Sequence, residues 1–269
     1  MRTAYPYAFI VVYFKALADN PHDRLTLFDA GTNMVTASPP DICAVLERAV
    51  LLCGKSNGDY ACPFCNMSGL TVDELWFHCP AYHINSQQDK LPCPICKEIP
   101  NTPTQAHIHH HHKPSSEPEI PSGRKVPMYS FSLVVCRHPV SGDYLLCQEF
   151  ANQGFWLPGG AVDYGEKLCH AAIREAKEEA GIDIELKGIL AMEQSAHKKY
   201  SRQRVIFYAE PKNPAQPPKT IPDFESAGAC WCTKEEIWKG LRLRGSEPLE
   251  WTRYLDAGGT IYPMAILRE

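Results

Sequence analysis

Three glutamates at helical spacing are the residues of this sequence best suited to chemistry. Glu175, Glu178 and Glu179 stand at positions i, i+3 and i+4, which places three side chains on one face of a helix. Like charges at this spacing repel, so the arrangement is costly unless a cation neutralises it. Ligands that offer only oxygen select Mg²⁺ or Mn²⁺ over zinc. The pattern therefore predicts a divalent-metal site.

The helix that carries these glutamates is predicted over about residues 167–180. Apolar side chains recur on a neighbouring stripe at spacings of four, three and four, and this stripe can pack on a sheet. They are Cys169, Ile173, Ala176 and Ala180. The same helix is thus expected to be anchored on one face and charged on another.

The segment around the helix resembles a known family. From Gly160 to Ile182 it is similar to the Nudix box, G-x5-E-x7-R-E-u-x-E-E-x-G-u with u apolar, and it matches every defined position. Glu166 and Arg174, eight residues apart, could pair and hold the preceding loop against the helix. Gly181 fills the glycine position at the end of the box.

The resemblance implies an α/β fold, namely an α/β/α sandwich in which helices flank a mixed sheet. Members of this family hydrolyse a nucleoside diphosphate linked to another moiety. The resemblance assigns metal binding to Glu175, Glu178 and Glu179, with help from the Gly160 carbonyl. It assigns structural support to the remaining box residues, Glu166, Arg174 and Gly181.

The chemistry of such a reaction also follows from the residues themselves. A diphosphate repels hydroxide, so cations must screen its oxygens and lower the pKa of a bound water. A carboxylate can then accept the proton of that water. The box leaves open which glutamate does so; Glu225, outside the box, is a further candidate, although a surface carboxylate near a turn is the commoner case. The basic loop 197–202 could bind phosphates or a base, or be a solvated turn.

A second kind of chemistry is indicated by cysteines and histidines. The spacing of a zinc finger is present here. A C-P-F-C knuckle is followed by a gap of twelve residues and then by two histidines five positions apart. Its expected ligands are Cys62, Cys65, His78 and His83. Pro80 is expected to end or kink the ligand-bearing helix before the second histidine. Cys79 is an alternative to a histidine ligand.

A second knuckle follows. Its expected zinc ligands are Cys93, Cys96, His107 and His112, with the whole tract His109–His112 offering possible fourth ligands. Pro100 and Pro103 predict a short ligand-bearing helix or none. The alternative for the histidine tract is a low-complexity patch that binds metals loosely.

Charge argues against nucleic acid as a partner. The chain carries a formal net charge of −4. Residues 53–113 hold four lysines, no arginine and five acidic residues, so they lack the cations that neutralise phosphates. A protein partner is expected instead, and the C-P-x-C knuckle followed by D-E-L-x-x-H loosely resembles fingers that bind ubiquitin. Four apolar side chains of this region could serve as anchors for a partner: Leu70, Trp76, Phe77 and Tyr82. We expect one or two of them to be exposed; the alternative is that they pack on the rest of the chain.

Four segments are expected from composition. Residues 1–52 have no assigned role beyond a helix at 41–52; residues 53–113 form the zinc-finger region. Residues 114–126, rich in Pro, Ser, Gly and charge, predict a linker. Residues 127–269 form the Nudix domain. Its expected strands are 129–136, 144–149, 182–192, 204–210 and 228–232, and its expected helices beyond the box are 234–239 and 249–256.

The cysteine content and the lengths of the apolar runs limit the classes of protein to which the chain can belong. Seven of the twelve cysteines lie between Cys43 and Cys96, several in pairs beside histidines, which is typical of metal ligation in a reducing compartment. No apolar run reaches eighteen residues, so no membrane span is expected. The segment 5–14 has only a faint signal-peptide outline. We expect a protein of the cytoplasm or nucleus.

Two functions from different classes fit the sequence. The first is a metal-dependent pyrophosphohydrolase with Mg²⁺ or Mn²⁺ in the box, Zn²⁺ in the N-terminal region, and a finger module that binds a partner. The second is a catalytically silent adaptor whose fingers bind a protein such as ubiquitin. The intact box favours the first, because an adaptor does not need to keep the carboxylates.

Overall fold

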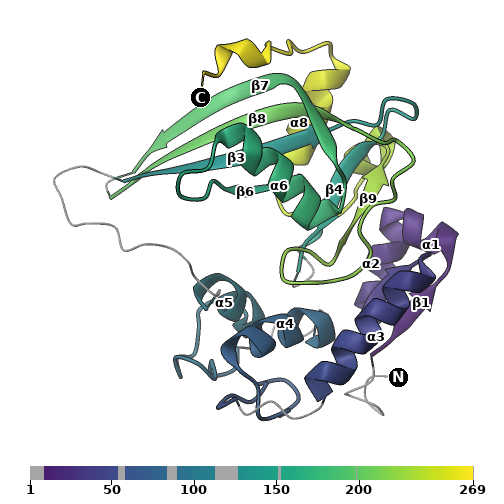
Figure 1. Cartoon of the computed structure of the whole chain (residues 1–269), viewed down its shortest axis with the longest axis vertical. Helices are drawn as coiled ribbons and strands as arrows, with labels where there is room; N and C mark the ends of the chain where they lie inside the picture. The colour runs from purple at the N-terminus through teal and green to yellow at the C-terminus, as the bar shows by residue number, and fades with distance from the viewer. Residues whose placement is uncertain are drawn as a thin grey trace. The chain divides into compact units, whose positions relative to one another are not determined.

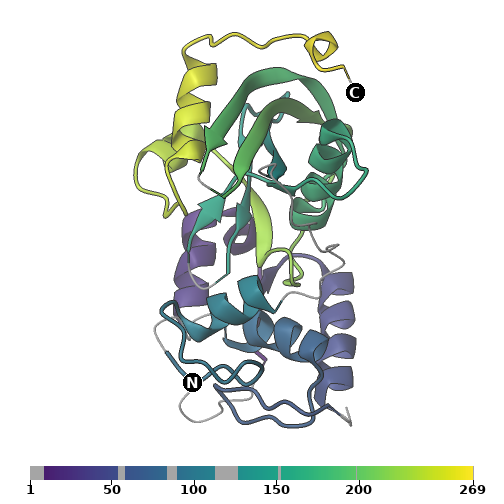
Figure 2. The same ribbon diagram turned by 90° about the vertical axis from the view of Figure 1, so that its left-hand side faces the viewer.

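The computed structural model of the chain describes residues 9–53, 58–83, 90–112, 127–150, 153–197 and 199–268 (Figures 1 and 2). Two compact units are present. Unit 1 comprises Met1–Ser116, Gln148–Gly154 and Thr220–Gly228. Unit 2 comprises Glu117–Cys147, Phe155–Lys219 and Ala229–Glu269. The predicted linker, residues 114–126, lies outside the described residues.

Unit 2 is built on a four-stranded mixed sheet of order β6-β3-β8-β7. Its central strands, β3 (Met128–Cys136) and β8 (Ser201–Pro211), run parallel, while β7 (Ile184–Ala196) and β6 (Gly159–Ala161) are antiparallel to their neighbours. A second sheet has the order β5-β4-β9. Its strands are β5 (Phe155–Trp156), β4 (Tyr144–Gln148) and β9 (Gly228–Cys232).

Helices lie on both sides of the four-stranded sheet. The box helix α6 (Leu168–Ala180) and the helix α8 (Glu247–Asp256) occupy opposite sides of it (Figure 2). The short α7 (Lys234–Trp238) begins with a capping box, and a 3₁₀ turn, η1 (Met264–Ile266), follows α8. This is the helix-flanked mixed sheet that the sequence predicts.

The predicted apolar stripe of α6 is buried in part: Ala176 and Ala180 are fully buried, whereas Ile173 and Cys169 are half-buried. Ala172, Ala176 and Ala180 are fully buried in one core with Val134 of β3 and Phe207 of β8. Alanine side chains let the helix approach the sheet closely, so the charged face of α6 is held at a fixed distance from the strands.

Residues 11–36, in the part of the chain for which the sequence indicates no role, form a small β-α-α-β element in unit 1. The strands β1 (Val11–Tyr13) and β2 (Met34–Thr36) pair in parallel. Between them lie α1 (Lys15–Asp19) and α2 (Pro21–Asp29). The predicted helix over 41–52 is confirmed as α3 (Pro39–Cys53).

A buried arginine joins this element to two distant segments of unit 1. Arg24 is 0% exposed, and its guanidinium donates to the Val35 carbonyl (2.9 Å), the Gln148 Oε1 (3.2 Å) and the Ala227 carbonyl (3.4 Å). Phe28 and Phe150 pack in the same small core. The segments 148–154 and 220–228 therefore belong structurally with the N-terminal element.

The finger region contains two helices, α4 (Val72–His83) and α5 (Thr104–His111). The expectation that Pro80 ends or kinks the first helix is wrong in one respect, because α4 continues as helix to His83. A proline removes one backbone hydrogen bond, and the buried Cys79 and Tyr82 keep the last turn packed. The predicted short helix after the second knuckle is confirmed as α5.

All the strands and helices predicted for the Nudix region are present, with bounds that differ by up to four residues. The two short strands β5 and β6 were not predicted, because runs of two or three residues have no readable period. Within the described part of the chain, no helix combines the length and the hydropathy needed to cross a bilayer.

We predict that Arg24→Met destabilises unit 1 by at least about 2 kcal/mol, because three buried acceptors lose their donor. Urea unfolding followed by circular dichroism measures the shift. Lys15→Ala is the control, since its ion pair with Asp19 is exposed and worth under about 0.5 kcal/mol. Equal midpoints for the two variants would contradict the role assigned to Arg24.

Candidate functional site

The three box glutamates lie along α6, with Glu175 the most deeply placed at 7% exposed. Its carboxylate lies against Gly160 of β6, where a Cβ would stand only 2.5 Å from the Glu175 Oε1. Any side chain at this position would displace the carboxylate. Glycine therefore allows the β6 backbone to approach Glu175 closely.

Glu179 is fixed from the same strand. Its Oε2 accepts a hydrogen bond from the Gly159 N–H at 2.9 Å. Gly159 has φ of 152°, and a Cβ there would meet the Ser132 carbonyl oxygen at 2.3 Å. Two successive glycines thus bring the β6 backbone against both α6 and β3.

Arg174 is the main polar link between the loop and the helix. Its Nε and Nη2 donate to the two carboxylate oxygens of Glu166, each at 2.9 Å, so the expected pair is present in two-pronged form. Nη2 also donates to the Ala161 carbonyl at 3.0 Å. Nη1 donates to Glu175 (2.9 Å) and Glu178 (3.0 Å).

The attraction between the charges of Arg174 and Glu166 is strong because both side chains are largely buried. The Arg174 hydrogen bonds hold the pKa of Glu166 below its usual value, with burial acting against them and the Asp163 N–H adding a further bond. The hydrogen bonds from Arg174 to Glu166 likewise raise the pKa of the guanidinium. Both groups are therefore charged at neutral pH.

The end of α6 is set by Gly181. This residue adopts φ of 73°, the left-handed region that terminates helices. A Cβ there would also stand 3.0 Å from the Lys219 Cβ. Glycine is required for both reasons, which accounts for its place at the end of the box.

The donor set fits a hard divalent cation. Carboxylates and a backbone carbonyl are the oxygen ligands that Mg²⁺ and Mn²⁺ take, and Glu175, Glu178, Glu179 and the Gly160 carbonyl could supply them. In the structure these carboxylates bond to Arg174 and Gly159 instead of forming one tight cluster. Glu225 belongs to unit 1, where its backbone N–H donates to the Asp223 Oδ1 at 2.9 Å. Glu225 and the box glutamates therefore belong to different units.

The basic loop is partly described. His197 and Tyr200 stack, with ring centroids 4.4 Å apart, and Lys198 lies outside the described residues. Arg202 lies over the ring of Phe131 at 4.8 Å. Tyr200, the aromatic residue of the loop, is exposed.

The first set of zinc ligands converges as predicted. The thiol and imidazole atoms of four residues lie within 4.8 Å of one another: Cys62, Cys65, His78 and His83. The His78 Nε2 is 3.3 Å from the Cys65 Sγ and 3.2 Å from the His83 Nε2. Tetrahedral coordination at about 2.0–2.3 Å places ligand atoms roughly 3.3–3.7 Å apart. The four atoms therefore fit zinc; Cys79 is buried beside them but is not one of the four.

The second set also converges, and it includes the fourth ligand expected from the tract: Cys93, Cys96, His107 and His112. The His107 Nε2 is 3.3 Å from the Cys96 Sγ and 3.2 Å from the His112 Nε2. Burial lowers the pKa of both histidines, which favours the neutral imidazole that binds metal. His109 instead stacks on Trp76, and the side chain of His110 lies outside the described residues.

The two knuckles contain the same kind of turn. The Asn66 N–H donates to the Cys62 carbonyl, and the Lys97 N–H donates to the Cys93 carbonyl, each at 2.9 Å. Asn66 and Lys97 both have positive φ, 59° and 65°. The same local geometry at both sites supports two metal centres of one kind.

The expectation of exposed aromatic anchors is not met. Leu70, Trp76 and Tyr82 are buried, and Phe77 is half-buried. The Trp76 Nε1 donates to the His109 carbonyl at 3.0 Å. Its ring also lies 4.9 Å from that of Phe224, while the Tyr82 ring lies 5.2 Å from that of Phe9. These side chains pack on other parts of unit 1, which is the alternative considered above.

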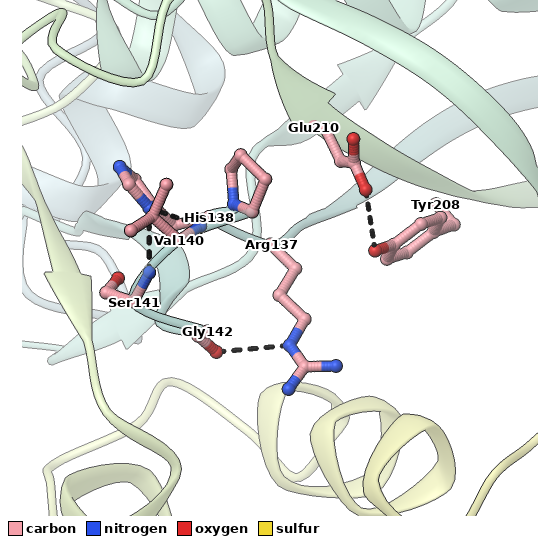
Figure 3. Close-up of a pocket in the computed structure, with 8 residues that line it drawn as sticks. Arg137, His138, Val140, Ser141, Gly142, Tyr208 and Glu210 are labelled. Carbon is pink, nitrogen blue, oxygen red and sulfur yellow. Dashed lines mark hydrogen bonds between the residues drawn. The ribbon is translucent and has the colours of Figure 1, made fainter.

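A pocket of about 440 Å³ lies at the turn between β3 and β4, far along β3 from the box (Figure 3). The Arg137 Nε donates to the Gly142 carbonyl at 3.2 Å, and the Tyr208 hydroxyl donates to Glu210 at 3.3 Å. None of the predicted site residues lines it. The candidate site is therefore defined by the box geometry and not by this pocket.

Comparisons with known proteins agree with this geometry. The NUDIX domain family matches residues 128–252, and the zinc-binding domain of drought induced 19 protein (Di19) matches residues 58–113. Nudix hydrolase 10 of Arabidopsis thaliana is 38% identical over 84 residues, 31% of this chain and 30% of that protein. Human 8-oxo-dGDP phosphatase NUDT18 is 33% identical over 103 residues, 37% of this chain and 31% of that protein. The chain thus spans about a third of these relatives.

Solved structures show similar chains. A NUDIX hydrolase from Nitrosomonas europaea has 20% identity and a TM-score of 0.44, covering 53% of this chain and 97% of its own. A C. elegans Ap4A hydrolase binary complex has 23% identity and a TM-score of 0.40, covering 48% and 96%. The family matches place a segment similar to the NUDIX domain at residues 128–252, after a segment similar to the zinc-binding domain of Di19 at residues 58–113.

We predict that the full-length protein binds two zinc ions through the two Cys/His sets. Elemental analysis of the purified chain measures the content. The double change Cys93→Ser and Cys96→Ser should lower it to one, because serine does not replace a thiolate ligand of zinc. Cys230→Ser, at a buried cysteine outside the sets, should leave it at two. A wild-type protein without zinc would contradict this prediction.

We predict that Glu166→Gln lowers the free energy of unfolding by about 2 kcal/mol at pH 7, because the charged hydrogen bonds to Arg174 are weakened. The folded-state pKa of Glu166 is lowered. The stabilisation is therefore complete above the unfolded value, about 4.3, and is lost as pH falls through the folded value. Urea unfolding at a series of pH values tests this; a pH-independent difference would contradict it.

Proposed function

We propose that this protein is a divalent-metal-dependent pyrophosphohydrolase that cleaves a phosphoanhydride in a nucleoside diphosphate derivative. The observation that carries the proposal is the contact of Glu175 and Glu179 with the two glycines of β6. It brings carboxylate oxygens of α6 against the backbone of β6, and a hard cation takes carboxylate and carbonyl oxygens as ligands.

Each side chain has a role in this proposal. Glu175, Glu178 and Glu179, with the Gly160 carbonyl, would hold Mg²⁺ or Mn²⁺. The metal, when bound, screens the diphosphate oxygens and lowers the pKa of a water. Arg174 orients two of the glutamates and, through Glu166, fixes the loop. The carboxylate that accepts the proton is one of the box glutamates or Glu225.

The substrate class rests on the composition of the box and on the relatives. One relative is named for a phosphatase of 8-oxo-dGDP, a nucleoside diphosphate. The residues that match the NUDIX domain model, 128–252, include the box, so we place the substrate of this protein among nucleoside diphosphate derivatives. A silent adaptor remains the alternative, and the intact ion-pair network of Arg174 favours the enzyme.

We propose further that the zinc-binding domain packs mainly against other segments of its own chain. Trp76 packs on Phe224 and His109 packs on Phe150, so each contacts one of the two segments that unit 1 takes from the Nudix match. A protein partner such as ubiquitin would have to use other surfaces. Nucleic acid is disfavoured by charge, and the partner of the site is a small molecule.

We predict that the double change Glu178→Gln and Glu179→Gln lowers the Mg²⁺- or Mn²⁺-dependent hydrolysis rate at least about a hundredfold. Glutamine keeps the size of the side chains but removes two charges that hold the cation, which is worth several kcal/mol in the transition state. Phosphate or nucleotide release from a panel of nucleoside diphosphate derivatives measures the rate.

The matched control replaces Glu185 and Glu235 together by glutamine. Glu185 lies on β7 and Glu235 on α7, and neither belongs to the box. This control should hydrolyse at the wild-type rate. A double box variant as active as this control would contradict the assignment.

A further inference from the structure

Four rings of unit 1 follow one another in contact, and we call them the ring chain: Phe150, His109, Trp76 and Phe224. The centroids of successive rings are 5.2, 5.2 and 4.9 Å apart. The two middle rings belong to α5 and α4 of the finger region. The two outer rings belong to the segments 148–154 and 220–228, which lie within the residues matched by the NUDIX domain. The ring chain therefore connects the finger helices to two segments of that match.

Helices that carry zinc ligands hold the two middle rings. Trp76 lies on α4 together with two ligands of the first set, and His109 lies on α5 together with His107 of the second set. The Trp76 Nε1 donates to the His109 carbonyl at 3.0 Å, so the two helices are joined at this point. Cysteines of both fingers lie in one small core. A core of this size keeps its helices in place only when the ligands are tied together.

The bases of the two segments are held without the fingers. The Ala227 N–H donates to the Gln148 carbonyl at 2.9 Å, which joins one segment to the other. Arg24 of α2 donates to the Gln148 Oε1 and to the Ala227 carbonyl. Phe150 packs in a core with Phe28 of the same helix. None of these residues is a zinc ligand, so this base is expected to persist without metal.

The tip of the segment 220–228 is a tight turn over residues 223–226. The Asp223 N–H donates to the Ser226 carbonyl at 3.1 Å, and the Asp223 Oδ1 accepts from the N–H groups of Glu225 (2.9 Å) and Ser226 (3.3 Å). Phe224 lies in this turn and is 43% exposed, so only part of its ring is packed. The ring that it contacts is that of Trp76. The turn therefore meets the finger region through this aromatic pair.

We propose that the fingers restrain the turn 223–226 through the contact between Trp76 and Phe224, so that loss of zinc from the fingers loosens the turn while the base stays in place. The same segment leads directly into β9 and carries Glu225. The zinc content of the fingers thus reaches a part of the Nudix match that contains no zinc ligand of either set. This inference goes beyond the proposed function, because it concerns the control of a segment and holds for any substrate.

The test is amide hydrogen exchange of the full-length protein, with its zinc and after zinc removal by EDTA. The N–H groups of Glu225 and Ser226 report on the turn, and that of Ala227 reports on the base. Zinc removal should speed exchange in the turn about three- to tenfold, the effect of losing an aromatic pair. Exchange of the Ala227 N–H should stay unchanged. Elemental analysis checks that the zinc has been removed.

Two variants of Phe224 test the contact from the side of the turn. Phe224 is not part of the finger core, so both variants should keep their zinc. In Phe224→Ala the turn should exchange fast with or without zinc. Phe224→Tyr keeps the ring and should keep the response to zinc. The matched control is Ile99→Ala, an apolar side chain of the finger region that is 68% exposed; it should respond as the wild type does.

Turn exchange that does not change when zinc is removed would overturn the proposal. A response of Phe224→Ala equal to that of the wild type would overturn it as well. Faster exchange of Ala227 by the same factor as the turn would also count against it, because unit 1 would then be opening as a whole.

These outcomes are independent of the hydrolase assignment, because hydrogen exchange needs no substrate. A wild-type protein that shows the zinc response and hydrolyses no diphosphate derivative would contradict the proposed function and leave this inference standing. A protein that hydrolyses such derivatives and shows no zinc response would do the reverse.

Discussion

The two-pronged ion pair between Arg174 and Glu166 is the interaction on which the candidate active site depends. Three nitrogens of one guanidinium make five hydrogen bonds, which tie the loop to the helix and hold two further glutamates in place. Such a cluster of carboxylates on one helix face would otherwise repel itself. Arg174 therefore makes the charged face compatible with a stable helix before any metal binds.

The close packing of α6 on the sheet supplies the second constraint. Alanines on its buried stripe and glycines on β6 bring the backbones together, so the carboxylates reach a strand from a helix. Side chains of ordinary size would separate the two elements.

The N-terminal unit is held together by different means. Metal-ligand sets stand in for a large core in the finger region, as is usual for domains of this size. Arg24, fully buried and bonded to three acceptors, joins the first fifty residues to segments 148–154 and 220–228. Unit 1 is thus assembled from parts far apart in the sequence.

The sequence alone determined the local features. The carboxylate face of α6, the Glu166–Arg174 pair and the two zinc-ligand sets follow from fixed spacings along short segments, where helix geometry or a knuckle leaves little freedom. Tertiary structure alone decided the rest. The burial of Trp76 and Tyr82, the partners of Arg24 and the separation of Glu225 into unit 1 depend on which distant segments pack together. Long-range packing leaves no periodic signal in the sequence, because its partners are set by the complementarity of whole elements.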